Sequence, residues 1–160
     1  MPKQNESYQS KAKRLIGSNK YLVLATCGVD SRPWASPVFF AHDSEYNLYF
    51  ISAVDSQHCK NIIQNPFVGV AIFDSAQRVG SSEGVQIEAR ASMVGKTDIK
   101  KIIGLYFRRL SPGSKAHATE QYNPSDYLEP SEFRFFKVSI IKAYVTGVER
   151  RVEVDLLETT

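Results

Sequence analysis

Short polar side chains crowd one stretch of this sequence, "SAVDSQH" at residues 52–58, directly after the apolar run "NLYFI". Ser52 and Ser56 bring hydroxyl groups, Gln57 an amide, and His58 a ring N–H or a full charge. Helix-like spacing begins at once afterwards, so these groups stand where a strand ends and a helix starts. The first N–H groups of a helix lack intrahelical acceptors and carry partial positive charge, which suits an anion such as phosphate.

A plainer interpretation is open for the same residues. Asp55 or Ser56 simply caps the helix, as short polar residues do at most helix starts, and His58 is then a solvated surface residue. Lys60 lies one turn into the helix and would add charge to an anion site. Taken alone, these residue types favour the cap over the anion site.

Length, composition and charge limit the class of protein. The chain has 160 residues, 42% hydrophobic and 23% charged, which predicts one globular domain over residues 1–160. A net charge of +3 is too weak to argue for nucleic acid. The two cysteines and three histidines show no metal-ligand spacing, so we expect no metal. Since no apolar run is long enough for a membrane span or a signal peptide, we expect a cytoplasmic protein without a membrane partner.

Hydrophobic periodicity supplies the elements that would position these side chains. Strands are expected at 21–26, 34–42, 47–53, 67–74, 84–95 and 133–148, and helices at 7–19, 56–64 and 97–110. In the middle helix, the expected inward face is Cys59, Ile62 and Ile63. Residues 149–160 read as an exposed tail or one more short strand. About six strands joined mostly by short turns predict a small closed or half-closed antiparallel barrel, in which closure removes exposed strand edges.

The order of these motifs resembles a known family. "YLVLAT", then "PWASPV", then "LYFISAVDSQHCKNIIQNP" and "VGVAIFD" are similar to the pyridoxamine 5′-phosphate oxidase-like, FMN-binding split-barrel family, over about residues 10 to 148. The resemblance implies a mainly β fold with helices, a six-stranded antiparallel split β-barrel with Greek-key topology. It also implies a homodimer that binds FMN at the subunit interface, while some members bind F420 or haem instead.

The resemblance assigns site residues position by position. Ser52 and Ser56, with Ala53 between them, fall near the flavin phosphate, and Gln57 and His58 fall where the oxidase itself has Arg and Lys. Ser36 falls where the oxidase usually has another phosphate-binding Arg, and Lys60 would serve as a supporting cation. Further positions that the resemblance implies for the cofactor site are Pro37, Val38 and Phe39 along the isoalloxazine ring, Gln86 from across the dimer, and Trp34. Trp34 either stacks on the ring or packs in the core or dimer interface.

The implied function is a flavin-dependent oxidoreductase acting on a small-molecule substrate that the sequence does not identify. Oxidase activity on pyridoxamine phosphate is not expected, because the C-terminal segment "AYVTGVERRVEVDLLETT" lacks the histidine of the substrate-holding pair. No catalytic residue is assigned. The alternatives are a non-catalytic cofactor-binding or sensing module, and a small barrel that binds single-stranded nucleic acid through Phe39, Tyr46 and Tyr49, which the weak charge disfavours.

Overall fold

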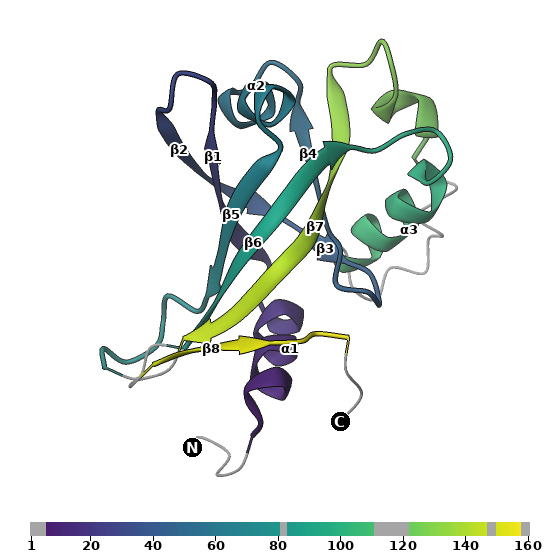
Figure 1. Ribbon diagram of the computed structural model, residues 1–160. Coiled ribbons are helices and arrows are strands. Elements are labelled where there is room, and N and C mark those ends of the chain that lie inside the picture. The colour runs from purple at the N-terminus through teal and green to yellow at the C-terminus, as the bar shows by residue number, and fades with distance from the viewer. Residues whose placement is uncertain (1–5, 81–82, 111–121, 147–149, 158–160) are drawn as a thin grey trace.

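The computed structural model describes residues 6–80, 83–110, 122–146 and 150–157. Within these residues, eight strands form one curled antiparallel sheet in the order β2-β1-β5-β6-β7-β4-β3, with β8 beside β7 (Figure 1). The strands are β1 Tyr21–Cys27, β2 Pro33–Phe39, β3 Ala41–His42, β4 Leu48–Ala53, β5 Phe67–Phe73, β6 Gly84–Met93, β7 Phe133–Thr146 and β8 Arg151–Val154. The helices are α1 Tyr8–Ser18, α2 Gln57–Gln64, α3 Ile99–Leu110 and the short 3-10 turn η1 Pro124–Tyr127. The expected mainly β split-barrel fold is confirmed, as a curled sheet that forms a half-barrel.

The two edges of the sheet are joined by one residue. Strands β2 and β3 end the strand order on opposite sides, yet only Phe40 separates them in the chain. Phe40 is fully buried, and its backbone N–H donates to the carbonyl of Lys20 over 3.2 Å. The sequence predicted one strand over 34–42, and the break comes from this buried crossing.

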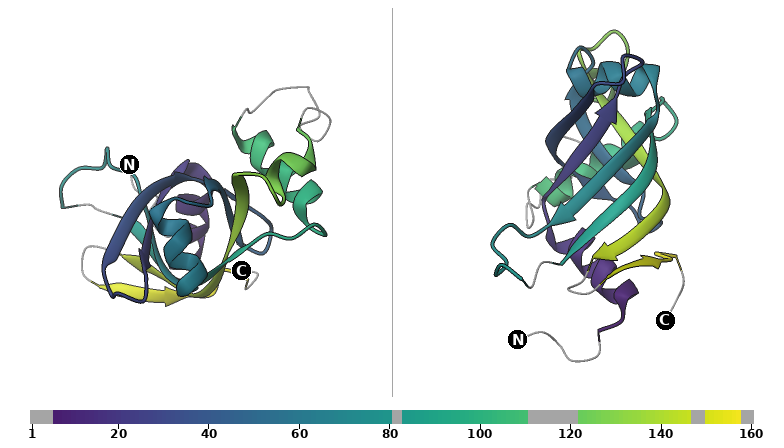
Figure 2. Two further views of the ribbon diagram at one scale, coloured as in Figure 1. Left: turned by 90° about the horizontal axis from the view of Figure 1, so that it is seen from above. Right: turned by 60° about the vertical axis from the view of Figure 1, so that its left-hand side comes forward.

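Two helices close the ends of the barrel, and a third lies outside it. Seen from above, α2 sits within the ring of strands, whereas α3 stands to one side (Figure 2). α1 lies at the opposite end from α2, where Ala12, Leu15 and Ile16 enter the main core (Figure 1). This core is formed by alternate residues of β1, β5, β6 and β7, as the burial of Val85, Ile87, Ala89 and Ala91 illustrates.

A second, smaller core lies between α3 and the sheet. Ile99, Ile102, Ile103, Tyr106 and Phe107 pack there against residues of β3, β4 and β7, as the helical spacing predicted. The Arg109 guanidinium donates to the carbonyls of Ile16 and Asn19 and lies 4.7 Å from the ring centre of Phe40. Arg109 thus ties α3 to the end of α1.

The C-terminal segment forms the short strand that the sequence offered as the alternative to an exposed tail. Strand β8 pairs with β7, with Val154 opposite Ala143, and Leu156 is buried in the main core. Among the described helices, none has both the length and the apolar character that crossing a membrane requires.

Candidate functional site

Four polar side chains from separate elements meet beneath the start of α2. Ser36 comes from β2, Ser52 from the end of β4, Ser56 from the turn before α2, and His58 from the first turn of α2. We call these four residues the hydroxyl–histidine cluster. Strands β2 and β4 bring the serines together because the curl of the sheet carries both strands toward α2 (Figure 2).

The imidazole of His58 is the centre of this cluster. Its Nδ1 lies 3.1 Å from the Ser36 hydroxyl, and its Nε2 lies 2.8 Å from the Ser52 hydroxyl and 3.2 Å from that of Ser56. The Ser52 and Ser56 hydroxyls are 3.2 Å apart. A neutral imidazole has one donor and one acceptor nitrogen, so one side of the ring donates to a hydroxyl and the other accepts from one.

Burial keeps His58 neutral. Its side chain is 9% exposed and meets the ring of Phe50 edge-on at 5.9 Å. Desolvation lowers the pKa of His58 below its ordinary value of 6.5. The prediction of a solvated surface histidine is therefore wrong, and so is the expectation that Ile63 faces inward, because Ile63 is 64% exposed while His58 and Asn61 occupy the buried face of α2.

The N-terminus of α2 has no side-chain cap. Ser56 occupies the N-cap position, but its hydroxyl bonds within the cluster and accepts no N–H of the helix. The capping interpretation of Ser56 is thus not what the structure shows. The backbone N–H groups of the first turn remain available as donors beside the hydroxyls, which is the donor set that a phosphate requires.

Sequence reasoning missed a second row of polar contacts behind the cluster. The amide of Asn61 donates to the Thr26 hydroxyl over 3.0 Å and accepts from Gln57 Nε2 over 2.9 Å. Asn61 and Thr26 are both 3% exposed. A Cβ at Gly28 would stand 3.0 Å from Asn61 Oδ1, so glycine allows the β1–β2 turn to approach α2 closely. The available signal was the spacing of Asn61, three residues after His58 on the same helical face.

The other predicted site residues lie apart from the cluster. Gln57 and Lys60 are exposed on α2, and Trp34 is 50% exposed on β2. Pro37, Val38 and Ala53 continue the strands that carry Ser36 and Ser52, whereas the Phe39 ring packs on Tyr106 at 5.1 Å. Gln86 lies on the outer face of β6, opposite Ala71 of β5.

The cluster can bind an anion through neutral donors. Three hydroxyls, one imidazole and the start of α2 supply hydrogen bonds, but the only cations nearby in sequence, Lys60 and Arg32, are exposed. Arg32 lies 3.8 Å from Asp30 as an ion pair. In the part of the chain that the structure describes, no group of three or more potential ligands could hold a metal ion.

One family model and two relatives of known sequence match this chain. Residues 8–144 match the family model described as pyridoxamine 5′-phosphate oxidase. The chain is 31% identical over 111 residues to the pyridoxine/pyridoxamine 5′-phosphate oxidase of Ehrlichia ruminantium, covering 69% of this chain and 53% of that protein. It is 30% identical over 88 residues to the UPF0306 protein PM1958 of Pasteurella multocida, covering 54% of this chain and 59% of that protein. The match with each of these two relatives thus extends over less than two thirds of the relative's length.

Solved structures share the fold at low identity. A haem-binding protein from Mycobacterium smegmatis superposes with a TM-score of 0.74 at 18% identity, covering 94% of this chain and 59% of that one. HutZ, the haem storage protein from Vibrio cholerae, superposes with a TM-score of 0.68 at 20% identity, covering 91% of this chain and 100% of that one. ChuZ from Campylobacter jejuni superposes with a TM-score of 0.72 at 17% identity, covering 96% of this chain and 61% of that one. At these identities the likeness concerns the fold alone.

Proposed function

Because the chain belongs to the pyridoxamine 5′-phosphate oxidase family, we propose that it is an FMN-binding oxidoreductase that acts on a small molecule. The observation that carries the proposal is the uncapped start of α2 beside the hydroxyl–histidine cluster. A hydroxyl at an N-cap position usually satisfies the helix, so a hydroxyl turned away from it leaves those N–H groups for a ligand.

The residues present fit the phosphate end of FMN through neutral contacts. Ser52 and Ser56 donate hydroxyl hydrogens, and the first N–H groups of α2 complete the phosphate site. His58 orients these hydroxyls from the buried side. Bidentate guanidinium contacts are missing from the cluster, so we expect weaker FMN binding than an arginine-based site would give.

Bound FMN supplies the hydride or electron transfer itself, and the chain supplies position and a dry ring site. The backbone of β2 at Pro37 and Val38 lies next to Ser36 in sequence and would hold the flavin ring of a cofactor whose phosphate the cluster binds. None of these residues acts as an acid or base in the proposal. The cluster would hold the cofactor in place.

Titration of the purified protein with FMN tests the proposal. A flavin spectrum and saturable binding support it, and Ser56→Ala should weaken binding by roughly tenfold, the loss of a hydrogen bond to a charged group. Lys60→Ala, on the exposed side of α2, serves as the control for charge alone and should change affinity less. A colourless protein that binds FMN no better than the Ser56→Ala variant would overturn the proposal.

We also propose a homodimer with the cofactor between subunits. The outer face of β1, β5 and β6 carries small residues, Ala25, Gly69 and Ala71, in a shallow hollow of about 270 Å³ that Gln86 also lines. Phe67 and Phe73 on the same strand β5 are 58% and 50% exposed. A face of this kind is suited to cover by a second copy, and it would bring Gln86 to the partner's cofactor.

A glycine substitution separates dimer loss from unfolding. A Cβ at Gly69 would meet only Ala25 Cβ, at the ordinary distance of 3.6 Å. Gly69 pairs with Glu88 across the strands, so Gly69→Lys adds a bulky charge to this face without placing like charges opposite each other. We expect this variant to sediment as a monomer and to lose FMN affinity. Gly17→Lys on α1 is the control, because a Cβ there meets nothing within 4 Å. A dimeric Gly69→Lys protein, or a wild-type monomer with FMN bound, would contradict the two-subunit site.

The second candidate is a non-catalytic cofactor-binding or sensing module that holds haem or F420. Its support is that the cluster carries no fixed cation for a phosphate and that structural neighbours are named as haem-binding and haem storage proteins. A haem Soret band in place of a flavin spectrum, or preferential binding of F420 in competition with FMN, distinguishes this candidate from the first.

A further inference from the structure

Strand β7 lacks a strand partner over a short stretch of one edge. On that edge β4 pairs with Phe133 to Val138, and β8 pairs with Ala143 to Thr146. Among the described residues, no strand pairs with residues 139–142 on this side. The other edge of β7 is occupied by β6, with a register shift between Glu88 and Ala89. β4 and β8 therefore lie in line along β7, with a gap between them where the sheet splits.

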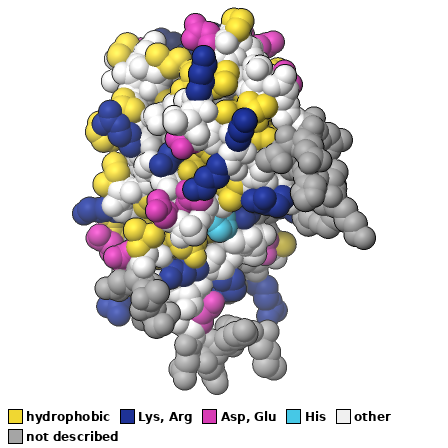
Figure 3. All heavy atoms as spheres, turned by 90° about the vertical axis from the view of Figure 1, so that its right-hand side faces the viewer, with side chains coloured by type: hydrophobic (Ala, Val, Ile, Leu, Met, Phe, Trp, Pro, Cys, Tyr) yellow, Lys and Arg dark blue, Asp and Glu magenta, His cyan; other side chains and the backbone are white. Residues whose placement is uncertain are grey.

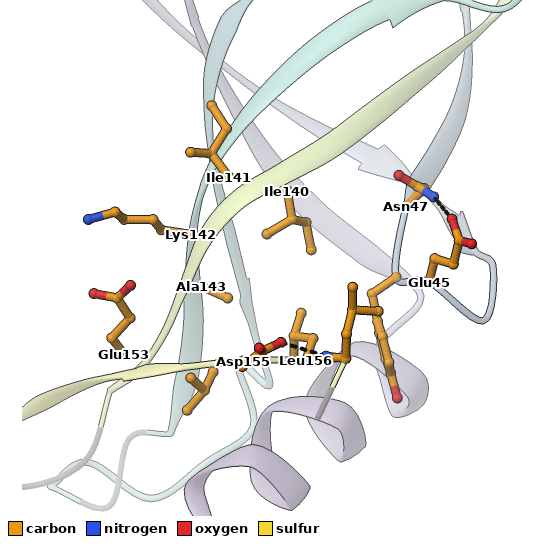
Figure 4. A pocket seen from close by; sticks show the side chains of 12 residues that line it. Glu45, Asn47, Ile140, Ile141, Lys142, Ala143, Glu153, Asp155 and Leu156 are labelled. Atoms are coloured by element: carbon orange, nitrogen blue, oxygen red, sulfur yellow. Dashed lines mark hydrogen bonds between the residues drawn. The ribbon is translucent and has the colours of Figure 1, made fainter. Parts of the chain in front are cut away.

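The gap is a groove with an apolar floor. A cavity of about 590 Å³ lies between the β3–β4 turn, β7 and the end of β8. Ile140, Ala143 and Leu156 gather on its inner side (Figure 4). Ile141 and Leu157 also line it and are 53% and 64% exposed, so apolar surface remains uncovered there. We call this space the split groove.

Carboxylates dominate the charged groups of the split groove. Its lining includes three carboxylates, those of Glu45, Glu153 and Asp155, and a single ammonium group, that of Lys142. Lys142 points away from the floor on the same side as Glu153 (Figure 4). Lys13 reaches the turn end of the groove, 6.0 Å from the ring centre of Tyr46. At the β8 end, the two carboxylates of Glu153 and Asp155 face only one lining ammonium group, that of Lys142, so a basic residue of a ligand is best placed there.

Basic charge is scattered over the described residues on the face of the molecule that Figure 3 shows. Figure 3 shows lysine and arginine side chains interspersed with acidic ones and with apolar patches, rather than one continuous field. A ligand of the groove is thus selected by local contacts, not by a general surface potential.

We propose that the split groove binds an extended peptide segment of a partner protein in which apolar residues alternate with lysine or arginine. The segment adds to β7 at residues 139–142 as a short strand, between the ends of β4 and β8. Alternate side chains of an extended segment point to opposite faces, so its apolar residues reach Ile140 and Leu156 while its basic residues face Glu153 and Asp155. Backbone hydrogen bonds to a free strand edge give affinity, and the alternate side chains give selectivity.

The test uses a capped peptide Lys-Val-Lys-Val-Lys titrated into labelled protein and followed by backbone amide NMR. We expect shifts concentrated at residues 139–142 and 153–157, together with slower hydrogen exchange of the amides in 139–142. Two isomers of this peptide, each N-methylated on one edge, separate strand addition from charge attraction. The isomer methylated on the edge that faces β7 should not bind, and the other should bind normally.

Conservative variants test the charges without disturbing the turns. Asp155→Asn keeps the side-chain acceptor for the Leu157 N–H, and Glu45→Gln keeps that for the Asn47 amide. Asp155→Asn should weaken peptide binding by roughly two- to fivefold and Glu45→Gln by less, while the exposed control Glu132→Gln should not change it. The proposal would be overturned if a Glu-Val-Glu-Val-Glu peptide bound as tightly as the lysine peptide, or if both methylated isomers bound equally. It would also be overturned if 1,5-diaminopentane saturated the same amides and the lysine peptide bound no more tightly than this diamine.

Discussion

Strand β4 links two regions that differ in how their polar groups are satisfied. It begins at Leu48 beside the split groove and ends at Ser52 in the hydroxyl–histidine cluster. In the cluster, every ring nitrogen and hydroxyl already has a partner within 3.2 Å. In the groove, no strand among the described residues pairs with residues 139–142 of β7, and apolar side chains stay exposed.

The difference determines what a ligand must do in each place. A ligand of the cluster exchanges one set of hydrogen bonds for another, so its net gain per bond is small unless it carries charge. A ligand of the split groove adds hydrogen bonds and covers apolar surface without displacing protein contacts. Variants that loosen one region and leave the other unchanged will show how independent the two are.

The largest effect is expected from Phe50→Ala. Phe50 is fully buried, stacks on Phe136 at 5.3 Å and supports the His58 ring from below. Loss of this ring should lower the free energy of unfolding by about 3–5 kcal/mol in urea titrations. The matched Phe133→Ala, at a ring that is 49% exposed, should cost less than about 1 kcal/mol. Comparable losses in the two variants would show that the buried Phe50 ring adds no more to stability than the half-exposed Phe133 ring.

A smaller, pH-dependent effect is expected from His58→Gln. Because burial lowers the pKa of His58 in the folded chain, the unfolded chain binds the proton at higher pH. Wild-type stability is therefore complete above the ordinary histidine pKa of about 6.5 and declines as pH falls toward the lowered folded value.

The measurement compares urea midpoints of the two proteins between about pH 7.5 and pH 5.5. The wild type should lose stability more steeply than His58→Gln, since the remaining histidines are common to both and cancel. Parallel pH profiles would mean that His58 titrates in the folded protein as it does in the unfolded chain.

The smallest effect is expected from Glu83→Gln, at the end of the barrel that α1 closes. The carboxylate of Glu83 lies 2.6 Å from Lys11 Nζ and 2.9 Å from Arg14. These partly exposed ion pairs should contribute about 0.5–1 kcal/mol, measured as the difference in unfolding free energy at low and high salt.

The pKa of Glu83 is lowered, chiefly by the hydrogen bond from Lys11. The stability that Glu83 contributes is therefore present above the ordinary carboxyl pKa and is lost as pH falls toward the lowered pKa of the folded protein. Amide shifts in Glu83→Gln should appear in α1 and β8 but not at the hydroxyl–histidine cluster. Shifts at Ser52 or His58 would instead show that the two ends of the barrel are coupled.

The fold was predictable because its signals are local. The alternation of Val85, Ile87, Ala89 and Ala91 anticipates the burial pattern of β6, and the spacing from Ile99 to Phe107 anticipates α3. The interruption at Phe40 gave no such signal, because the residue is apolar like its neighbours and only its crossing between edges sets it apart.

The candidate site was predictable in its members but not in its arrangement. Ser52, Ser56 and His58 are close in sequence, so their types mark the helix start. The inward turn of His58 depends on Ser36, which lies 22 residues earlier and reaches the ring only through the curl of the sheet. For the same reason, the contact of Asn61 with Thr26, 35 residues apart, was beyond any local pattern.

The link through Phe40 also bears on how chains of this fold can change in length. A residue inserted beside Phe40 would push apart the two edges that this single buried position holds together, and the N–H contact with Lys20 would be lost. The turn at residues 74–80 bears no such constraint, because its side chains are mostly exposed and its internal hydrogen bonds are local. Duplication or lengthening events that preserve the barrel are therefore expected at that turn and not at the crossing, which can be tested by grafting a glycine–serine insert at each position and comparing soluble yield.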